Sequence, residues 1–243
     1  MAEAVELIRC TWPEVQNYLD RGSDMILLPT GATEQHGPSC AIGTDYFLAD
    51  SFARRISEQT GVMMGPCLGI GDSLSLSAFP GTIALRPSTL MSVVHDYISS
   101  LYRYGFHRIL VVGAHWDNHF PVHAALSELA NELLDLRFLV LDFWDISTVR
   151  DAIRDEFGES GGHADAADVS LMLSLDSSLV REDLLVSEFP PVSYQVGREL
   201  TRSLLTSSGV IGSDQTKASA EAGARIFDLA VEGYISAIEV LSK

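Results

Sequence analysis

Cysteines are scarce in this chain. The 243 residues contain three of them, Cys10, Cys40 and Cys67, and no pair has the CxxC spacing of a redox or zinc motif. A small and odd number of cysteines argues against a disulfide framework and is typical of proteins in a reducing compartment. We therefore expect a cytoplasmic protein that is stabilised by its core.

Positive charge is also in short supply. Lys and Arg together number 16 against 33 Asp and Glu, which gives a formal net charge of −17. Such a chain repels polyanions, so nucleic acid and anionic membrane surfaces are excluded as expected partners. The remaining expectation is a small-molecule substrate.

Long apolar runs are missing as well. No stretch approaches the roughly 20 apolar residues that a membrane span requires, and acidic Glu3 and Glu6 stand where a signal peptide needs basic residues. Hydrophobic residues nevertheless make up 47% of the chain, enough for a sizeable core. With no repeat and no break in composition, the sequence predicts a single domain over residues 1–243.

Apolar periodicity predicts strands alternating with helices along the first 145 residues. Thr11, Pro13 and Glu14 are typical of a helix start with a capping box. The expected strands are 25–28 (stopped by Pro29), 63–64, 108–112 and 138–141, and the expected helices are 46–58, 88–104, 121–134 and one long helix from Asp214 onward. This alternation indicates an α/β layered fold with a parallel sheet.

Residues able to bind metals gather in the loops that follow the expected strands, where open parallel sheets bind ligands. They are Glu34, His36, Asp45, His115, Asp117, His163 and Asp168. Glu34 and His36 are one residue apart, as are His115 and Asp117, and this spacing lets both members of a pair face one cavity. Imidazole and carboxylate ligands together suit Zn, Mn or Fe, and Asp45 could bridge two ions.

Simpler interpretations exist for these polar residues. The loop residues could be ordinary turn-forming side chains. His119 and His123 have the spacing of a metal-binding helix face, but we interpret His119 as a helix cap and His123 as a helix-surface residue. Other chemistries lack their motifs: no P-loop, GxGxxG or G-x-S-x-G occurs, which argues against a nucleotide-binding module and a serine hydrolase.

Five stretches of the chain, in order, resemble the creatininase (creatinine amidohydrolase) family. The first runs from Leu28 to Asp45 and contains Thr-Glu-Gln-His-Gly-Pro, and the second is Phe-Pro-Gly-Thr-Ile at 79–83. The others are 105–118 with His-Trp-Asp-Asn, 163–170 with His-Ala, and 209–223 with Gly-Val-Ile-Gly. The resemblance implies a three-layer α/β/α sandwich with a mostly parallel central sheet, and a homo-oligomer, usually a hexamer.

The resemblance also implies roles for individual residues. Glu34, Asp45 and His115 match the ligands of one metal ion, and His36, Asp45 and Asp117 match those of a second. His163 matches a histidine that donates or shuttles a proton. Four departures from the family pattern imply that the residues around the substrate differ: Asp117 and Asp168 each replace Glu, Gly162 replaces an acid, and Ser39-Cys40-Ala41 replaces His-Leu-Pro.

The expected activity is hydrolysis of a C–N bond, in a cyclic amide or a formamide, with two divalent ions (Zn, Mn or Fe) per chain. Two ions lower the pKa of a shared water, Asp117 or Asp168 takes its proton, and His163 passes a proton to the leaving nitrogen. Trp116 and Trp144, with Ser39, are expected to line the substrate, although core packing explains Trp116 equally well and Trp144 slightly better. The alternatives are a keto-inositol C–C hydrolase, a peptidase, or a metal-binding scaffold without catalysis.

Overall fold

The structure is a computed structural model that describes residues 2–158, 162–190 and 205–243. Its strands are β1 (Met25–Thr30), β2 (Met63–Met64), β3 (Arg108–Gly113), β4 (Arg137–Asp142), β5 (Ser187–Glu188) and β6 (Ser213–Asp214). Its helices are α1 (Trp12–Asp20), α2 (Thr44–Thr60), α3 (Pro87–Tyr102), α4 (His119–Glu132), α5 (Ser147–Phe157), α6 (Ala166–Asp176) and α8 (Ala220–Leu241). Short 3-10 helices include η2 (Leu74–Leu76), η3 (Trp116–Asn118) and η4 (Phe143–Asp145).

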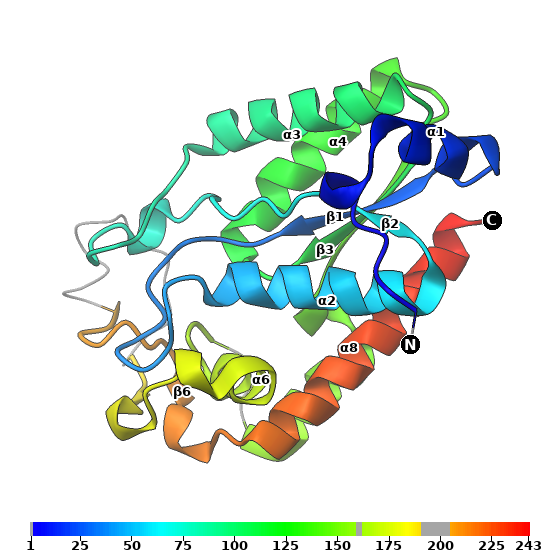
Figure 1. Cartoon of the computed structure of the whole chain (residues 1–243). Coiled ribbons are helices and arrows are strands. Elements are labelled where there is room, and N and C mark those ends of the chain that lie inside the picture. Colours follow the sequence, from blue (N-terminus) through cyan, green and yellow to red (C-terminus); the bar gives the residue numbers. More distant parts are fainter. Residues whose placement is uncertain (1, 159–161, 191–204) are drawn as a thin grey trace.

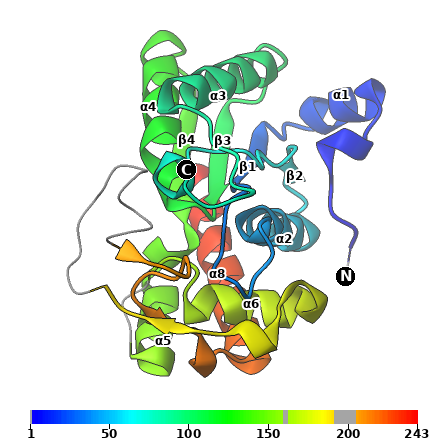
Figure 2. The ribbon, with the colours of Figure 1, turned by 90° about the vertical axis from the view of Figure 1, so that its left-hand side faces the viewer.

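The central sheet has the order β2-β1-β3-β4, and every neighbouring pair is parallel. Figure 2 looks toward the carboxyl ends of these strands and shows them in that order across the molecule. A separate antiparallel pair joins β5 to β6. Because all four main strands run the same way, the loops that follow β1, β3 and β4 meet at one edge.

Helices cover both faces of the sheet, so the molecule has three layers (Figure 1). On one face, side chains of α3 and α4 pack on Ile26 and Leu28 of β1 and on Ile109 and Val111 of β3. On the other face, α2, α5, α6 and α8 pack on the alternate residues of the same strands. The predicted α/β/α sandwich with a parallel sheet is confirmed.

Two predicted boundaries are wrong. β1 continues through Pro29 to Thr30. Pro29 lies beyond the end of β2, so no strand partner needs the N–H that proline lacks. Its carbonyl oxygen accepts the Leu68 N–H (3.0 Å). The long C-terminal helix begins only at Ala220, capped by the Ser219 hydroxyl, and Asp214 lies in β6 instead. The capping box of α1 is confirmed, with Glu14 reaching back to Thr11.

Helix α8 supports the functional end of the sheet. The hydroxyl of buried Tyr234 donates to the carbonyl oxygens of Gly113 (3.1 Å) and Leu141 (3.2 Å), at the carboxyl ends of β3 and β4. α8 also packs tightly on α6 at Gly223, where an added Cβ would lie 1.8 Å from the Ser170 carbonyl oxygen. The close approach of the two helices therefore requires glycine at this position.

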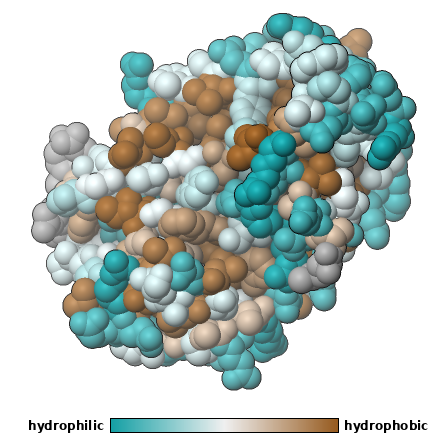
Figure 3. All heavy atoms as spheres, in the orientation of Figure 1, coloured by the Kyte–Doolittle hydropathy of each residue, from teal (hydrophilic) through white to brown (hydrophobic). Residues whose placement is uncertain are grey.

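The surface mixes apolar and polar residues. Figure 3 shows hydrophobic side chains exposed among hydrophilic ones, with the corner that carries α1 mostly hydrophilic. Large exposed apolar residues include Trp12 and Phe120. None of the helices in the described residues is long and apolar enough to cross a membrane.

We expect Gly223→Ala to destabilise the protein, although alanine favours a helix by about 1 kcal/mol over glycine. The added methyl group would overlap backbone atoms of α6, and overpacking of this kind costs about 1–3 kcal/mol. Urea unfolding measures the change, and Ala224→Ser at the exposed neighbouring position serves as the control. If Gly223→Ala were as stable as the wild type, the prediction would be wrong, because α6 and α8 could then move apart without a loss of stability.

Candidate active site

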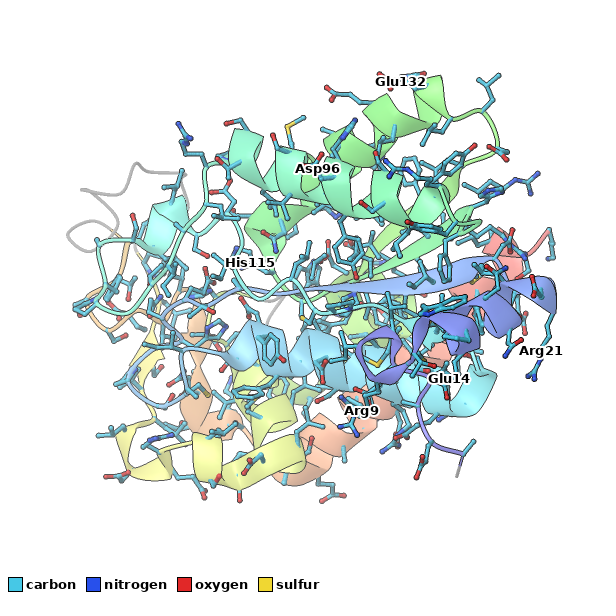
Figure 4. All side chains as sticks on the ribbon, turned by 45° about the horizontal axis from the view of Figure 1, so that its top comes forward. Arg9, Glu14, Arg21, Asp96, His115 and Glu132 are labelled. Atoms are coloured by element: carbon cyan, nitrogen blue, oxygen red, sulfur yellow. The ribbon has the colours of Figure 1, made fainter. Side chains whose placement is uncertain are left out.

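Loops from two adjacent strands and the first turn of a helix bring the predicted metal ligands together. Glu34 and His36 follow β1, His115 follows β3, and Asp45 lies in the first turn of α2. Gly31 allows this convergence, because a Cβ there would lie 2.4 Å from the Asp45 carbonyl oxygen. Figure 4 shows His115 well away from Glu14 and Arg21, and in the chain it follows the carboxyl end of β3.

One group of possible metal ligands consists of Glu34, Asp45 and His115, all buried. Nδ1 of His115 lies 3.0 Å from Asp45 Oδ2 and 3.3 Å from Glu34 Oε1. The other ring nitrogen, Nε2, lies 2.7 Å from the Asp72 carbonyl oxygen, which orients the imidazole. A backbone contact of this kind is the usual support for a histidine that binds a metal through its other nitrogen.

A second group consists of Glu34, His36 and His163. His163 Nδ1 lies 3.5 Å from Glu34 Oε1, and His36 Nε2 lies 2.9 Å from Asp45 Oδ1. The rings of His36 and His163 are 4.8 Å apart between their centroids. Glu34 therefore belongs to both groups, and Asp45 lies between the imidazoles of His36 and His115.

Unsatisfied carboxylate oxygens show that these residues fit a metal ion. Glu34 Oε2 and Asp45 Oδ2 are buried without a hydrogen-bond partner among the described residues, even though His115 Nδ1 lies 3.0 Å from the latter. The contact is close but lacks the alignment of a hydrogen bond. Donor atoms around one zinc ion, each at about 2.1 Å, stand roughly 3–3.4 Å apart, so the observed spacings suit donors that share a cation.

The buried charges support each other electrostatically. Burial would raise the pKa of Asp45, but His36 and His115 outweigh this effect and hold that pKa below its usual value. Burial likewise opposes the charge of Glu34, whose pKa is still lowered, mainly by His115. Burial would lower the pKa of His36, but Asp45 and its acidic neighbours raise it to about 10. The carboxylates are thus ionised and held by positive charge.

His163 is positioned by backbone contacts from a distant part of the chain. The backbone N–H of His163 donates to the Ile211 carbonyl oxygen (3.1 Å), and the backbone N–H of Ile211 donates to the His163 carbonyl oxygen (3.0 Å). The next residue, Ala164, adopts a left-handed backbone with φ of 52°, which turns the chain into α6. Burial lowers the pKa of His163.

The other two predicted acids lie at the same cavity but outside both ligand groups. Asp117, in η3, accepts a hydrogen bond from the Ser75 hydroxyl through Oδ2 (2.8 Å). Asp168 belongs to the capping box of α6, where its Oδ2 accepts the Asp165 N–H (3.1 Å). Burial and the neighbouring Asp165 raise the pKa of Asp168 well above its usual value. Their roles as ligand and base stay predictions.

All these residues border one cavity of about 620 Å³. Its remaining described walls are apolar, aromatic or charged and include Leu76, Trp116, Phe143, Trp144, Asp145, Arg150, Ile153, Asp165 and Ile211. The rings of Trp116 and Trp144 lie 6.3 Å apart, and the buried Trp144 Nε1 has no acceptor among the described residues. Both tryptophans therefore lie where a substrate would contact them.

The expectation that Ser39 lines the substrate is not supported. Ser39 is fully buried away from the cavity, and its hydroxyl donates to Gln215 Oε1 (2.9 Å). Gln215 in turn donates to the Ala164 carbonyl oxygen (2.7 Å), beside His163. Ser39 therefore helps to hold the backbone beside His163 in place and does not contact the cavity.

The sequence interpretation of His119 is also corrected. The residue begins α4 without capping it, and its Nδ1 lies 2.5 Å from Oδ2 of buried Asp142. Burial raises the pKa of Asp142 to about 6. With Asp145 these side chains form a further group of possible ligand atoms within 4.8 Å of one another. His123 is exposed on α4, as predicted.

One functional residue was missed because its position looks like a plain spacer between two ligands. The buried Gln35 side chain contacts His163 Nε2 (2.8 Å) through its amide nitrogen, which also donates to the Gly209 carbonyl oxygen (2.9 Å). Its Oε1 accepts the Gly37 N–H (2.9 Å). Gln35 therefore fixes the His163 ring. The only signal was its place between Glu34 and His36.

We expect Asp45→Asn to abolish metal binding, since an amide cannot supply the negative charge that His36 and His115 face. Elemental analysis after dialysis measures the metal content. Asp50→Asn, on the same helix but paired with Arg54, is the matched control and should keep the wild-type content. Wild-type metal content in Asp45→Asn would contradict the assignment.

Comparison with known proteins agrees with this arrangement. The profile of the Creatininase family, described as creatinine amidohydrolase, matches residues 9–238. A creatinine amidohydrolase of Pseudomonas putida is 30% identical over 98% of this chain and 97% of its own length. A mycofactocin precursor peptide peptidase of Mycolicibacterium smegmatis is 28% identical over 88% of this chain and 84% of its own.

A solved structure extends the agreement to the fold. A variant creatininase of the Zn–Zn type superposes with a TM-score of 0.88 at 27% identity, covering 98% of both chains. The profile match and the P. putida relative each span nearly the whole sequence. The chain therefore belongs to the creatininase family of metal-dependent amidohydrolases.

Proposed function

We propose that this protein is a binuclear metal-dependent hydrolase that cleaves a C–N bond in a cyclic amide or a formamide. The observation that carries the proposal is the ligand group of Glu34, Asp45 and His115, with His36 Nε2 lying 2.9 Å from the second oxygen of Asp45. Buried carboxylate oxygens and imidazole nitrogens together are the donor set of Zn, Mn or Fe sites. The unpartnered oxygens of Glu34 and Asp45 supply the negative charge for two cations.

Residues for two ions are present in the chain. Glu34, Asp45 and His115 would hold one ion, and His36 and Asp45 with Asp117 would hold the other. When bound, two divalent ions lower the pKa of a water molecule and polarise a substrate carbonyl. Asp117 lines the same cavity. The Ser75 hydroxyl donates to one of its carboxylate oxygens, which leaves the other oxygen for the second ion.

The protein side chains move the protons. Asp117 or Asp168 accepts a proton from the attacking water, and His163 delivers one to the leaving nitrogen. The Gln35 amide and the Ile211 backbone hold His163 in place for this transfer. Trp116 and Trp144 border the cavity and exclude water from a flat substrate.

Relatives of this chain differ in their substrates. Besides the amidohydrolase and the peptidase, a 3-dehydro-scyllo-inosose hydrolase of Thermotoga maritima is 22% identical over 69% of this chain and 55% of its own length. We favour C–N cleavage, since the amidohydrolase matches at higher identity over more of the chain. The proposal includes a cytoplasmic homo-oligomer, a hexamer by the family resemblance.

We expect close to two metal ions per chain in protein purified without added metal, and hydrolysis of a cyclic amide or a formamide, for which creatinine and a formamidopyrimidine nucleotide are the first compounds to assay. Elemental analysis and product assays measure these. A chelator should abolish turnover and added Zn or Mn should restore it, because the water is not acidic enough without the ions. Absence of metal, with none taken up on soaking, would contradict the proposal.

We expect His163→Gln to lower kcat by about 10²-fold or more, the usual contribution of a general acid, while the metal content stays at the wild-type level. His123→Gln, at an exposed position on α4, is the control. Steady-state kinetics and elemental analysis are read together. Loss of metal in His163→Gln would instead make His163 a ligand, as its place beside Glu34 also permits.

A further inference from the structure

One basic side chain in the cavity has no role in the chemistry proposed above. Arg150 lies in α5 and borders the same cavity as the ligand groups. It is the sole Lys or Arg among the described residues that line this cavity, where six acids also lie. In a protein with 33 acidic and 16 basic residues, a guanidinium at this place calls for an explanation.

Arg150 has no partner among the described residues. No hydrogen-bond acceptor or carboxylate oxygen there lies within contact distance of its guanidinium, whereas Arg154, one turn further on, pairs with Asp151 at 2.8 Å. Arg150 shares its helix face with Ile153, which also borders the cavity. The acids of α5 therefore do not neutralise Arg150, which borders the cavity with its charge unpaired among the described residues.

We propose that Arg150 recognises a carboxylate on the substrate. A guanidinium offers two parallel N–H groups that match the two oxygens of a carboxylate. The inference rests on the proposed function for the position of the reacting bond: the ligand groups hold the end that is cleaved, and Arg150, on the α5 wall, binds an anionic group elsewhere on the substrate. The substrate class is thus an amide or formamide with a free carboxylate, such as an N-acyl amino acid.

Charge balance favours a carboxylate over a phosphate. One guanidinium neutralises one negative charge, but a phosphate monoester carries about −1.5 to −2 at neutral pH. The excess charge would face Asp145 and Asp165, which line the same cavity. No second Lys or Arg among the described lining residues is present to offset it.

Three isosteric probes test the proposal. N-formylglycine has a carboxylate, N-formylglycinamide replaces it with a neutral amide, and N-formylaminomethylphosphonate replaces it with a dianion, while all three keep the formamide bond. Their Kd values are measured by calorimetry on the full-length, metal-loaded protein. The variants are Arg150→Gln, which keeps a polar stem without charge at an exposed position, and Arg154→Gln as the matched control on the same helix.

We expect wild type and Arg154→Gln to bind N-formylglycine about tenfold or more tightly than the amide, the effect of a hydrogen-bonded charge pair. In Arg150→Gln this preference should disappear, with the Kd of the amide unchanged. A preference that persists in Arg150→Gln would assign the carboxylate to the metal ions and overturn the proposal. Absence of a preference or of binding in wild type, or tighter binding of the phosphonate, would also overturn it.

These outcomes are separate from those of the proposed function. Binding is read as the Kd and cleavage as product formed, so a protein that discriminates the probes through Arg150 but cleaves no amide would keep the inference and contradict the hydrolase. A protein that holds two ions and cleaves formamides, but binds acid and amide equally, would keep the hydrolase and contradict the role of Arg150.

Discussion

Two carboxylates buried side by side are the constraint on which this site depends. Glu34 and Asp45 are almost completely removed from water, and each leaves one oxygen without a hydrogen bond. An ionised carboxylate in such surroundings is strongly destabilising unless a cation meets its charge. Imidazole nitrogens lie beside both carboxylates, and the unpartnered oxygens are suited to a cation. The residues around Glu34 and Asp45 are arranged to compensate this buried negative charge.

The scaffold brings these charges together by making neighbouring parallel strands end at one edge. The loops after β1 and β3 then need only a few residues to place Glu34, His36 and His115. Close packing keeps the edge in place: Gly31 lets the β1 loop lie against the start of α2, and Tyr234 ties α8 to the last carbonyls of β3 and β4. Precision at the site thus derives from buried backbone contacts.

The ligand groups and the opposite wall of the cavity come from different parts of the chain. The ligands lie mainly after β1 and β3, whereas Trp144, Arg150 and Ile153 belong to η4 and α5, which follow β4. Substitutions in the second region can change what the cavity binds without disturbing the ligands. Relatives of this chain bear the names of an amidohydrolase, a peptidase and an inosose hydrolase.

The layered fold and the ligand loops could be predicted from the order of the residues alone. Apolar runs of strand length alternate with amphipathic helices, and chemically distinctive residues follow the strands at one-apart spacing. Local pattern was insufficient where a neighbouring segment decides the outcome. Pro29 continues a strand because β2 is too short to need its N–H. The final helix begins at Ala220 and not at Asp214, because Asp214 pairs with β5.

Only the tertiary structure decided which polar residues face the cavity. Ser39 stands three residues after His36 yet is buried against Gln215, while Gln35, an unremarkable spacer in the sequence, orients His163 from 128 positions away. Arg150 likewise resembles any surface arginine until α5 is placed on the cavity wall. Spacing along the chain determines the direction of side chains within one element, but contacts between distant elements depend on how those elements pack.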